Sequence, residues 1–196
     1  MSATFEPLDL DGVVLVTPTV HGDDRGFFLE RYVAPSYLAH GIGPFVQDNH
    51  SRSVRGVLRG IHWQLPPKAQ GKLVSVVRGA ILDVAVDLRR GSASFGSWVG
   101  ARLDDRDHRQ LWVPPGFGHG FVVLSDVADV HYKSTAGYAP DLERGLRWDD
   151  PAVGIDWGLD PAGRGPTLSA RDARLPRLAQ LDDADLFPGG ATEGGS

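Results

Sequence analysis

Short apolar runs separated by glycine- and proline-rich turns dominate the hydrophobic pattern of this chain. Such runs occupy residues 13–20, 27–32, 57–63, 73–78, 80–88, 98–103, 110–113, 120–124 and 127–135. Runs of this length, bounded by turn residues, predict β-strands. Within residues 80–88, Ile81, Asp83 and Ala85 alternate with a second apolar set, which places them on one face of a strand. Helical signals are confined to residues 35–40 and to a short segment from Ser169 that Pro176 interrupts or ends. The pattern predicts an all-β sandwich or barrel with a few short helices.

Length and composition predict a single soluble domain. A chain of 196 residues suits one domain, for which we expect residues 1–186, with a flexible tail over residues 187–196. The net charge of −5 argues against nucleic acid as a partner. The absence of cysteine excludes disulfides and thiolate catalysis. Without a long apolar run or a signal peptide, the sequence predicts a cytoplasmic protein that does not enter a membrane.

Polar residues are set into the apolar strand predicted over residues 57–63. Arg59 and His62 stand among valine, leucine, isoleucine and tryptophan. Burying such a group without a partner costs about 1–3 kcal/mol, so each needs a partner or a ligand. A lone histidine in a strand is more often a satisfied core residue than a ligand. Here a second histidine, His119, ends a Pro-Pro-Gly-Phe-Gly-His run, which favours a site.

The two histidine segments resemble the paired motifs of the cupin superfamily, whose fold is a jelly-roll β-barrel. The first is Gly56, five residues and His62; the second is Pro114-x-Gly-x-x-His119. In metal-binding cupins the first motif continues with another histidine and a glutamate, but here Gln64 takes the histidine position and no glutamate follows before residue 79. Two histidines are fewer than the three or four protein ligands that a bound metal usually has. The sequence therefore predicts no metal.

Motifs for nucleotide cofactors and covalent catalysis are missing. Neither a P-loop, a Gly-x-Gly-x-x-Gly turn nor a serine nucleophile elbow is present, so we expect no cofactor. Acid–base chemistry remains: His62 is a candidate base, Tyr132 a candidate acid and Lys72 a cation for a developing oxyanion. Asp83 or Asp172 can orient His62. Three arginines are candidates for binding a diphosphate, namely Arg25, Arg59 and Arg171.

Motifs along nearly the whole chain resemble those of the dTDP-4-dehydrorhamnose 3,5-epimerase family. They are Asp24-Arg-Gly-x-Phe-x-Glu30, Gln47-Asp-Asn-His-Ser51, Gly56-Val-Leu-Arg-Gly-Ile-His62, Lys72, Gly79-x-x-x-Asp83-Val-Ala-Val-Asp-Leu-Arg89, Ser94-Phe-Gly96, Pro115-Gly-Phe-Gly-His-Gly-Phe121, Tyr132-Lys, Tyr138-x-Pro, Glu143-Arg-Gly and Leu168-Ser-x-Arg-Asp172. The resemblance implies a metal-free cupin homodimer. It also implies inversion of C3 and C5 of dTDP-4-dehydro-6-deoxy-D-glucose through an enolate.

The resemblance also implies a role for each matching residue. His62 is the base, paired with Asp172; Tyr132 is the acid and Lys72 stabilises the enolate. Tyr138 stacks on the thymine. The remaining substrate-binding residues are Arg25, Glu30, Gln47, Asn49, Arg59, His119, Glu143 and Arg171.

Two local questions stay open in the sequence. Strict alternation puts Arg59 and His62 on opposite faces of a strand, so both point inward only if the strand is bulged or kinked at Gly60. Asp172 lies three residues after Ser169 and is equally suited to capping a short helix.

Departures from the family pattern leave alternative functions. Trp63 replaces a residue that is more often tyrosine or phenylalanine, and His131 replaces an apolar one; both flank catalytic positions. A mono-epimerase acting at C3 or C5 alone keeps the same base and acid. A non-catalytic, ligand-binding cupin need not combine His62, Lys72 and Tyr132. A metal-dependent cupin oxygenase is the third alternative.

Overall fold

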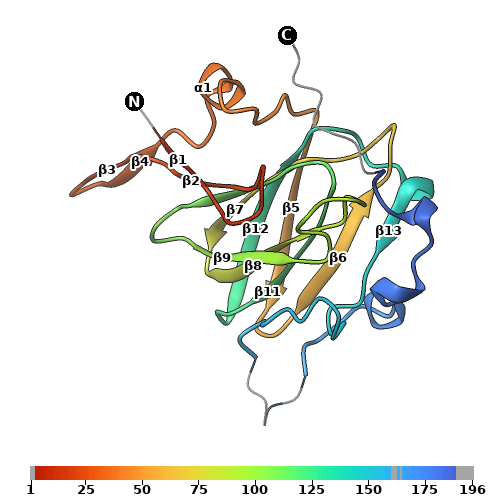
Figure 1. The fold of residues 1–196 in the computed structure, drawn as a ribbon. Coiled ribbons are helices and arrows are strands. Elements are labelled where there is room, and N and C mark those ends of the chain that lie inside the picture. Colours follow the sequence, from red (N-terminus) through yellow and green to blue (C-terminus); the bar gives the residue numbers. More distant parts are fainter. Residues whose placement is uncertain (1–2, 160–162, 164, 189–196) are drawn as a thin grey trace.

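Two antiparallel β-sheets pack face to face and form a jelly-roll barrel (Figure 1). The computed structural model describes residues 3–159, 163 and 165–188. In this part of the chain the first sheet has six strands, in the order β1 (Thr4–Pro7), β2 (Val14–Thr17), β10 (Gln110–Val113), β7 (Lys72–Arg78), β12 (Val127–Ser134) and β5 (Gln47–Val54). The second sheet has five, in the order β13 (Glu143–Gly145), β6 (Leu58–Gln64), β11 (Phe117–Val123), β8 (Ala80–Asp87) and β9 (Trp98–Asp104).

A separate hairpin and short helices complete the described residues. The hairpin consists of β3 (Val20–Asp23) and β4 (Gly26–Leu29), and it projects away from the barrel (Figure 1). The helices are α1 (Ala34–Leu38), η1 (Pro140–Leu142), η2 (Asp172–Arg174), η3 (Leu178–Gln180) and η4 (Asp183–Asp185). The predicted all-β jelly roll is confirmed. No helix among the described residues is long and apolar enough to cross a membrane.

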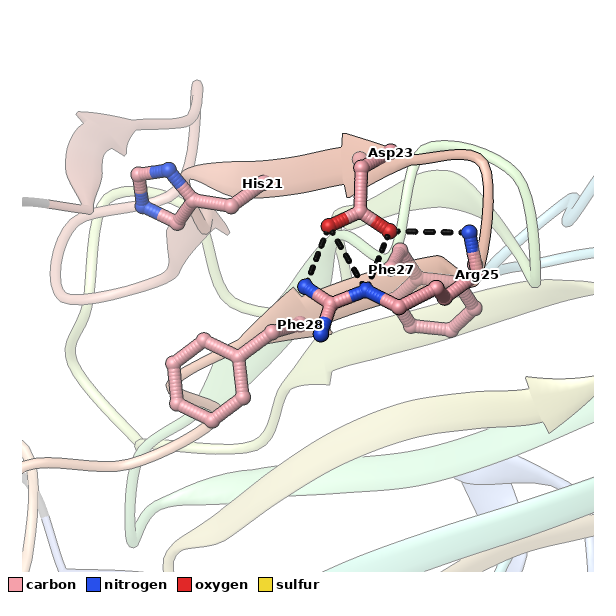
Figure 2. A pocket seen from close by; sticks show the side chains of 7 residues that line it. His21, Asp23, Arg25, Phe27 and Phe28 are labelled. Atoms are coloured by element: carbon pink, nitrogen blue, oxygen red, sulfur yellow. Dashed lines mark hydrogen bonds and ion pairs between the residues drawn. The ribbon is translucent and has the colours of Figure 1, made fainter.

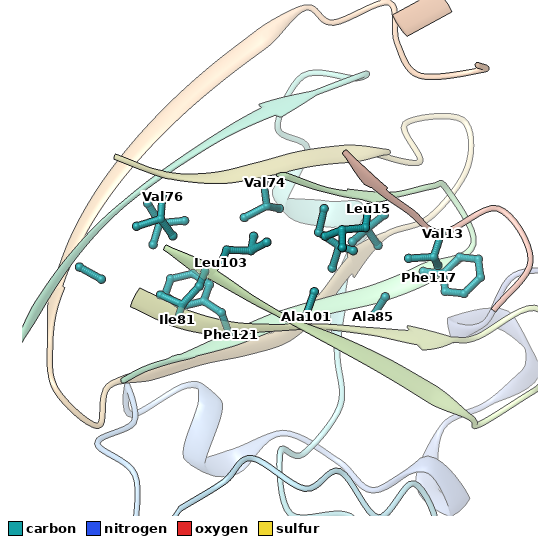
Figure 3. Close-up of a cluster of buried hydrophobic side chains, with 14 of the residues drawn as sticks. Val13, Leu15, Val74, Val76, Ile81, Ala85, Ala101, Leu103, Phe117 and Phe121 are labelled. Carbon is teal, nitrogen blue, oxygen red and sulfur yellow. The ribbon is translucent and has the colours of Figure 1, made fainter. Parts of the chain in front are cut away.

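The inner faces of the two sheets form the main core (Figure 3). Val74 and Val76 of the six-stranded sheet pack there with Ile81, Ala85 and Phe121 of the five-stranded sheet. Each buried side chain of this size contributes about 1.5–3 kcal/mol to folding. The predicted alternation in β8 is confirmed, because Ile81 and Ala85 lie in this core while Leu82 and Val84 pack in the cluster on the outer face.

The outer face of the five-stranded sheet is covered by the C-terminal part of the chain. Val84, Val86 and Leu88 pack there against Trp157 and Phe187. Phe187, the first residue of the predicted tail, is thus buried at 6% exposure, while residues 189–196 lie outside the described part. The single domain over residues 1–186 stays a prediction.

The structure differs from the predicted elements in several places. The strand expected over residues 13–20 is divided, because Val20 begins the hairpin rather than continuing β2. The turn expected between the runs 13–20 and 27–32 is shorter than that gap, since backbone pairing with β4 extends His21 and Asp23 despite their polarity. Strands β1, β5 and β13 were not predicted, and all three lie at sheet edges. Strands β1 and β13 are short, and β5 consists mainly of polar residues. The helix expected over residues 35–40 is confirmed as α1.

Candidate active site

A cavity between the two sheets has two lobes with a common wall. His62 on β6, Lys72 on β7 and Tyr132 on β12 line both lobes. The first, which we call the arginine lobe, has a volume of about 270 Å³ and is also lined by Ser51, Arg59, His119, Phe121, Ser169, Arg171 and Asp172. The second, the amide lobe, has a volume of about 160 Å³ and is also lined by Gln47, Asn49, Trp63, Gln64, Gln70, Ser134, Tyr138 and Glu143.

A bulge in β6 turns two polar side chains into the arginine lobe. His62 pairs with His119 of β11, and Arg59 pairs with Phe121, so three steps along β6 match two along β11. The extra residue falls at Gly60, whose φ of 117° suits only glycine and where a Cβ would lie 2.6 Å from the Cα of Gly120. The predicted bulge is confirmed, and it brings Arg59 and His62 to one lobe.

His62 is oriented by a buried carboxylate. Its Nε2 lies 2.6 Å from Oδ1 of Asp172, and the backbone N–H of Asp172 donates to Oγ of Ser169 at 3.0 Å. Burial opposes ionisation of Asp172, but the hydrogen bond from His62 leaves its pKa below the usual value. Because Asp172 is an anion, His62 donates its Nε2 proton and the neutral ring keeps a free lone pair on Nδ1. The predicted pair is present, and the Asp172 carboxylate binds His62 rather than capping the helix.

Lys72 and Tyr132 complete the wall, and burial shifts their pKa values in opposite directions. Burial lowers the pKa of Lys72 to about 8, against the opposing charges of Glu143 and Asp83. Burial raises the pKa of the Tyr132 phenol. Near neutral pH the site therefore offers an ammonium whose proton is weakly held and a phenol that stays protonated.

His119 lies opposite His62 and has its own carboxylate. Its Nε2 is 2.8 Å from Oδ1 of Asp83, which is fully buried on β8. Of the two carboxylates that the sequence offered as partners of His62, Asp172 binds His62 and Asp83 binds His119. The side chains of His119 and Arg59 both line the arginine lobe, and Arg59 Nε donates to Ser53 Oγ at 3.1 Å.

Tyr138 and Glu143 of the amide lobe form a hydrogen-bonded cluster with Arg171 of the arginine lobe. The Tyr138 hydroxyl donates to Oε2 of Glu143 at 2.9 Å, and Arg171 donates to the same oxygen at 2.5 Å. These contacts raise the pKa values of both Tyr138 and Arg171. Tyr138 is 57% exposed, so one face of its ring is open to a planar ligand.

Two amides of β5 form the side of the amide lobe. Gln47 Nε2 donates to Asn49 Oδ1 at 3.0 Å, and Gln47 Oε1 accepts the backbone N–H of Tyr138 at 2.8 Å. Asn49 Nδ2 is buried with no hydrogen-bond partner among the described residues. Asn49 therefore has a free donor for a ligand in this lobe.

Two predicted substrate-binding residues do not reach the cavity of their own chain. Arg25 lies in the turn of the β3–β4 hairpin, where it is exposed and bound to Asp23 at 2.5 Å (Figure 2). Glu30 follows β4, is exposed, and lines neither lobe. The hairpin projects away from the barrel of its own chain, and substrate binding by Arg25 and Glu30 stays a prediction.

Several residues that line the cavity were not predicted from the sequence. Ser51 Oγ and Ser134 Oγ are buried without a partner among the described residues, one in each lobe. The period of two in a strand was the available signal, since Ser51 follows Asn49 and Ser134 follows Tyr132 on the same faces. Nothing in the sequence indicates that Gln64, Gln70 and Phe121 line the cavity, because strands distant in the sequence bring them there.

The two departures from the family pattern have different surroundings. Trp63 lines the amide lobe, and its Nε1 donates to the Asp185 carbonyl at 2.9 Å. His131 faces away from the cavity and lies 3.1 Å from Asp48; burial lowers its pKa. Among the described residues, no group of three or more His, Cys, Asp or Glu side chains is arranged to hold a metal ion.

Fold and site together define a class: a jelly-roll protein whose cavity places an imidazole, an ammonium and a phenol around one space, equipped for acid–base chemistry. The family model for dTDP-4-dehydrorhamnose 3,5-epimerase matches residues 7–180, and the chain belongs to this enzyme family.

Individual relatives agree with this family over most of their length. The dTDP-4-dehydrorhamnose 3,5-epimerase of Pseudomonas aeruginosa is 52% identical, over 92% of this chain and 97% of the relative. The crystal structure of dTDP-6-deoxy-D-glucose-3,5-epimerase from Legionella pneumophila, in complex with dTDP-4-keto-L-rhamnose, aligns with a TM-score of 0.91 at 44% identity, covering 97% of this chain and 100% of that one. A dTDP-4-dehydrorhamnose 3-epimerase of Streptomyces niveus is 45% identical, over 96% of this chain and 90% of the relative.

Proposed function

We propose that this chain is an epimerase that inverts C3 and C5 of dTDP-4-dehydro-6-deoxy-D-glucose to give dTDP-4-dehydro-L-rhamnose. The observation that carries the proposal is the common wall of the two lobes, where His62, Lys72 and Tyr132 meet in a chain of this family. A 4-keto sugar suits this wall because C3 and C5 both adjoin the C4 carbonyl. One oxyanion site therefore serves both carbons.

His62 acts as the base. Its Nδ1 takes the proton from C3, the electron pair of the broken C–H bond forms a double bond to C4, and the carbonyl oxygen becomes an enolate. Asp172 stabilises the resulting imidazolium through Nε2, at 2.6 Å. A positioned base of this kind typically contributes about 10²–10⁴-fold to the rate.

Lys72 and Tyr132 complete each inversion. The Lys72 ammonium stabilises the enolate oxygen, where it is effective because the cavity is shielded from water. Tyr132 donates its phenolic proton to the opposite face of the carbon, so the configuration inverts. Solvent then returns the proton to Tyr132 and removes the one on His62, and the same sequence at C5 gives the doubly inverted product.

The remaining residues of the cavity hold the nucleotide. Arg59, His119 and Arg171 supply positive or hydrogen-bonding groups for the diphosphate. Tyr138 stacks on the thymine beside Glu143. Gln47 and Asn49 hydrogen-bond the sugar or nucleoside from the amide lobe.

We also infer that the enzyme is a homodimer in which the hairpin of one copy completes the cavity of the other. Phe27 and Phe28 are 61% and 60% exposed and line a hollow of about 340 Å³ over the hairpin (Figure 2). Exposed aromatic rings of this kind favour an interface. Arg25 and Glu30 reach neither lobe of their own chain, so they can contact the substrate only in the cavity of a second copy. We place the enzyme in the cytoplasm.

The test is the product formed from dTDP-4-dehydro-6-deoxy-D-glucose. Incubation with purified enzyme, followed by NMR, should give inverted configuration at both C3 and C5. Inversion at a single carbon would support a mono-epimerase. The relative from Streptomyces niveus, which is 45% identical and named a 3-epimerase, makes inversion at C3 alone the specific alternative. Binding of the dTDP-sugar without any inversion would contradict both and support a ligand-binding cupin.

A further inference from the structure

Asp83 is a buried carboxylate that the proposed reaction does not use. It is 0% exposed on β8, between Phe121 of β11 and Ala101 of β9. Oδ1 accepts the hydrogen bond from His119 at 2.8 Å, but Oδ2 is buried with no hydrogen-bond partner among the described residues. An open oxygen on a buried carboxylate is costly, and its presence beside a cavity suggests a task.

Lys72 enters the same cavity from β7 with no fixed partner. No hydrogen bond or ion pair joins its ammonium to another described residue. Charged and titratable groups surround it from several elements. They are Glu143 from β13, Asp83 from β8, His119 from β11, His62 and Arg59 from β6, Tyr132 from β12, Tyr138 from the segment after β12, and Arg171 and Asp172 at η2.

Glu143 and Asp83 are the carboxylates that act electrostatically on Lys72. Glu143 exerts the larger effect, but it is already bound by Arg171 at 2.5 Å and by Tyr138 at 2.9 Å. Asp83 has only one of its two oxygens occupied. Burial raises the pKa of Asp83, and the charges of His119 and Lys72 oppose that rise, so Asp83 and Lys72 each favour the charged form of the other.

We propose that Asp83 is a positioning residue that fixes His119 through one oxygen and whose charge keeps the Lys72 ammonium protonated. The proposal rests on the function above and deepens it, because only a protonated Lys72 can stabilise the enolate. Burial already brings the pKa of Lys72 down to about 8. Without the charge of Asp83, Lys72 would lose its proton within the working pH range.

The test variant is Asp83→Asn, which keeps the shape and the acceptor for His119 but removes the charge. The matched control is Asp87→Asn: Asp87 is also fully buried on β8, but it binds Arg89, Ser92 and Ser94 outside the cavity. Both variants remove one buried carboxylate from one strand. Circular dichroism and thermal unfolding then show how far each fold is maintained.

The direct readout is the pKa of Lys72, which needs no substrate. The chain contains three lysines, Lys68, Lys72 and Lys133, so protein labelled with ¹³C-lysine gives few side-chain signals, and Lys72→Met assigns the relevant one. Asp83→Asn should lower the Lys72 pKa by about one unit, as loss of a nearby opposite charge does, while Asp87→Asn leaves it unchanged. Equal Lys72 pKa values in Asp83→Asn and wild type would overturn the proposal.

The kinetic readout is the pH profile of kcat/KM. In Asp83→Asn its alkaline limb should move to lower pH by about the same unit, and activity should approach the wild-type level at pH 6–6.5, where Lys72 is protonated in both proteins. A purely structural defect would depress activity at every pH with the limb in place, and this result would also overturn the proposal. If wild type converts no substrate, the proposed function fails, and the NMR titration still decides whether Asp83 controls the charge of Lys72.

Discussion

Three side chains give the cavity its chemistry, and the surroundings of each suit its proposed role. His62 keeps a free Nδ1 because Asp172 binds its other nitrogen. The pKa of Lys72 is lowered and that of Tyr132 is raised by the same cause, burial. The sequence predicted these three residues from their chemistry and from the family resemblance. The residues alone left both Asp83 and Asp172 open as the partner of His62, because that choice depends on which strand or helix crosses the cavity at that point; the family resemblance implied Asp172.

His62→Ala should abolish turnover with little change in the dissociation constant of the dTDP-sugar, because a base stabilises the transition state rather than the bound substrate. Steady-state rates and calorimetric binding check this, with circular dichroism as the control for folding. If the variant retained a tenth of the wild-type rate, another group would have to be the base.

Lys72→Met should raise the barrier by about 2.7–4 kcal/mol, the cost of losing one oxyanion donor. Lys72→Arg should recover little, since a planar guanidinium does not replace a compact ammonium. In wild type, the ammonium is needed and the pKa of Lys72 is lowered to about 8, so kcat/KM should fall as pH rises through that value. A profile that stayed flat up to pH 10 would show that the charge of Lys72 is not required.

At the scale of single elements, β6 determines the geometry of the site. Its strand was predictable from apolar residues, and so was the need for an irregularity between Arg59 and His62. The short edge strands β1 and β13 were not predictable, because three or four residues carry too little pattern, and the partner of β13 is far along the chain. The same limit concealed Ser51 and Ser134, which are visible as lining residues only once β5 and β12 are aligned.

Gly60→Ala should destabilise the fold and disrupt the site together. The new Cβ would lie 2.6 Å from Gly120 Cα and 2.7 Å from the His119 carbonyl, and the φ of 117° is strained for alanine. We expect a loss of at least about 1–3 kcal/mol in the free energy of unfolding, measured by urea denaturation, with weaker dTDP binding. Gly56→Ala is the control, since its φ is also positive but no atom lies within 4 Å of the added Cβ. Equal losses in both variants would show that close packing at the bulge is unimportant.

At the scale of the whole molecule, the barrel supplies most of the site and the hairpin stays outside it. Composition and turn spacing predicted the β-barrel, and the family resemblance specified the jelly roll. Neither could show that Arg25 is remote from the cavity of its own chain, because sequence motifs carry no information about which copy a residue serves.

Mixing two impaired variants tests the proposed dimer. Arg25→Ala should weaken substrate binding, and His62→Ala should abolish turnover. In a mixed dimer, the cavity with an intact His62 receives an intact Arg25 from the other copy, so co-refolded variants should regain activity. A mixture no more active than Arg25→Ala alone would mean that the hairpin does not serve a second copy.

Tyr132→Phe separates the removal of the proton from its return. Without the hydroxyl the enolate can still form, because deprotonation requires only His62 and Lys72. The variant should therefore exchange substrate hydrogen with solvent while forming much less inverted product. Inversion at the wild-type rate would show that Tyr132 lines the cavity but does not act as the acid.

Deuterium incorporation tests the central claim most directly. In deuterium oxide, wild type acting on dTDP-4-dehydro-6-deoxy-D-glucose should give product labelled at both C3 and C5, because each inversion breaks one C–H bond and takes the new hydrogen from a solvent-exchanged acid. NMR of the product reports both positions at once. Inverted product without label at either carbon would contradict proton abstraction through an enolate, and label at only one carbon would contradict double epimerisation.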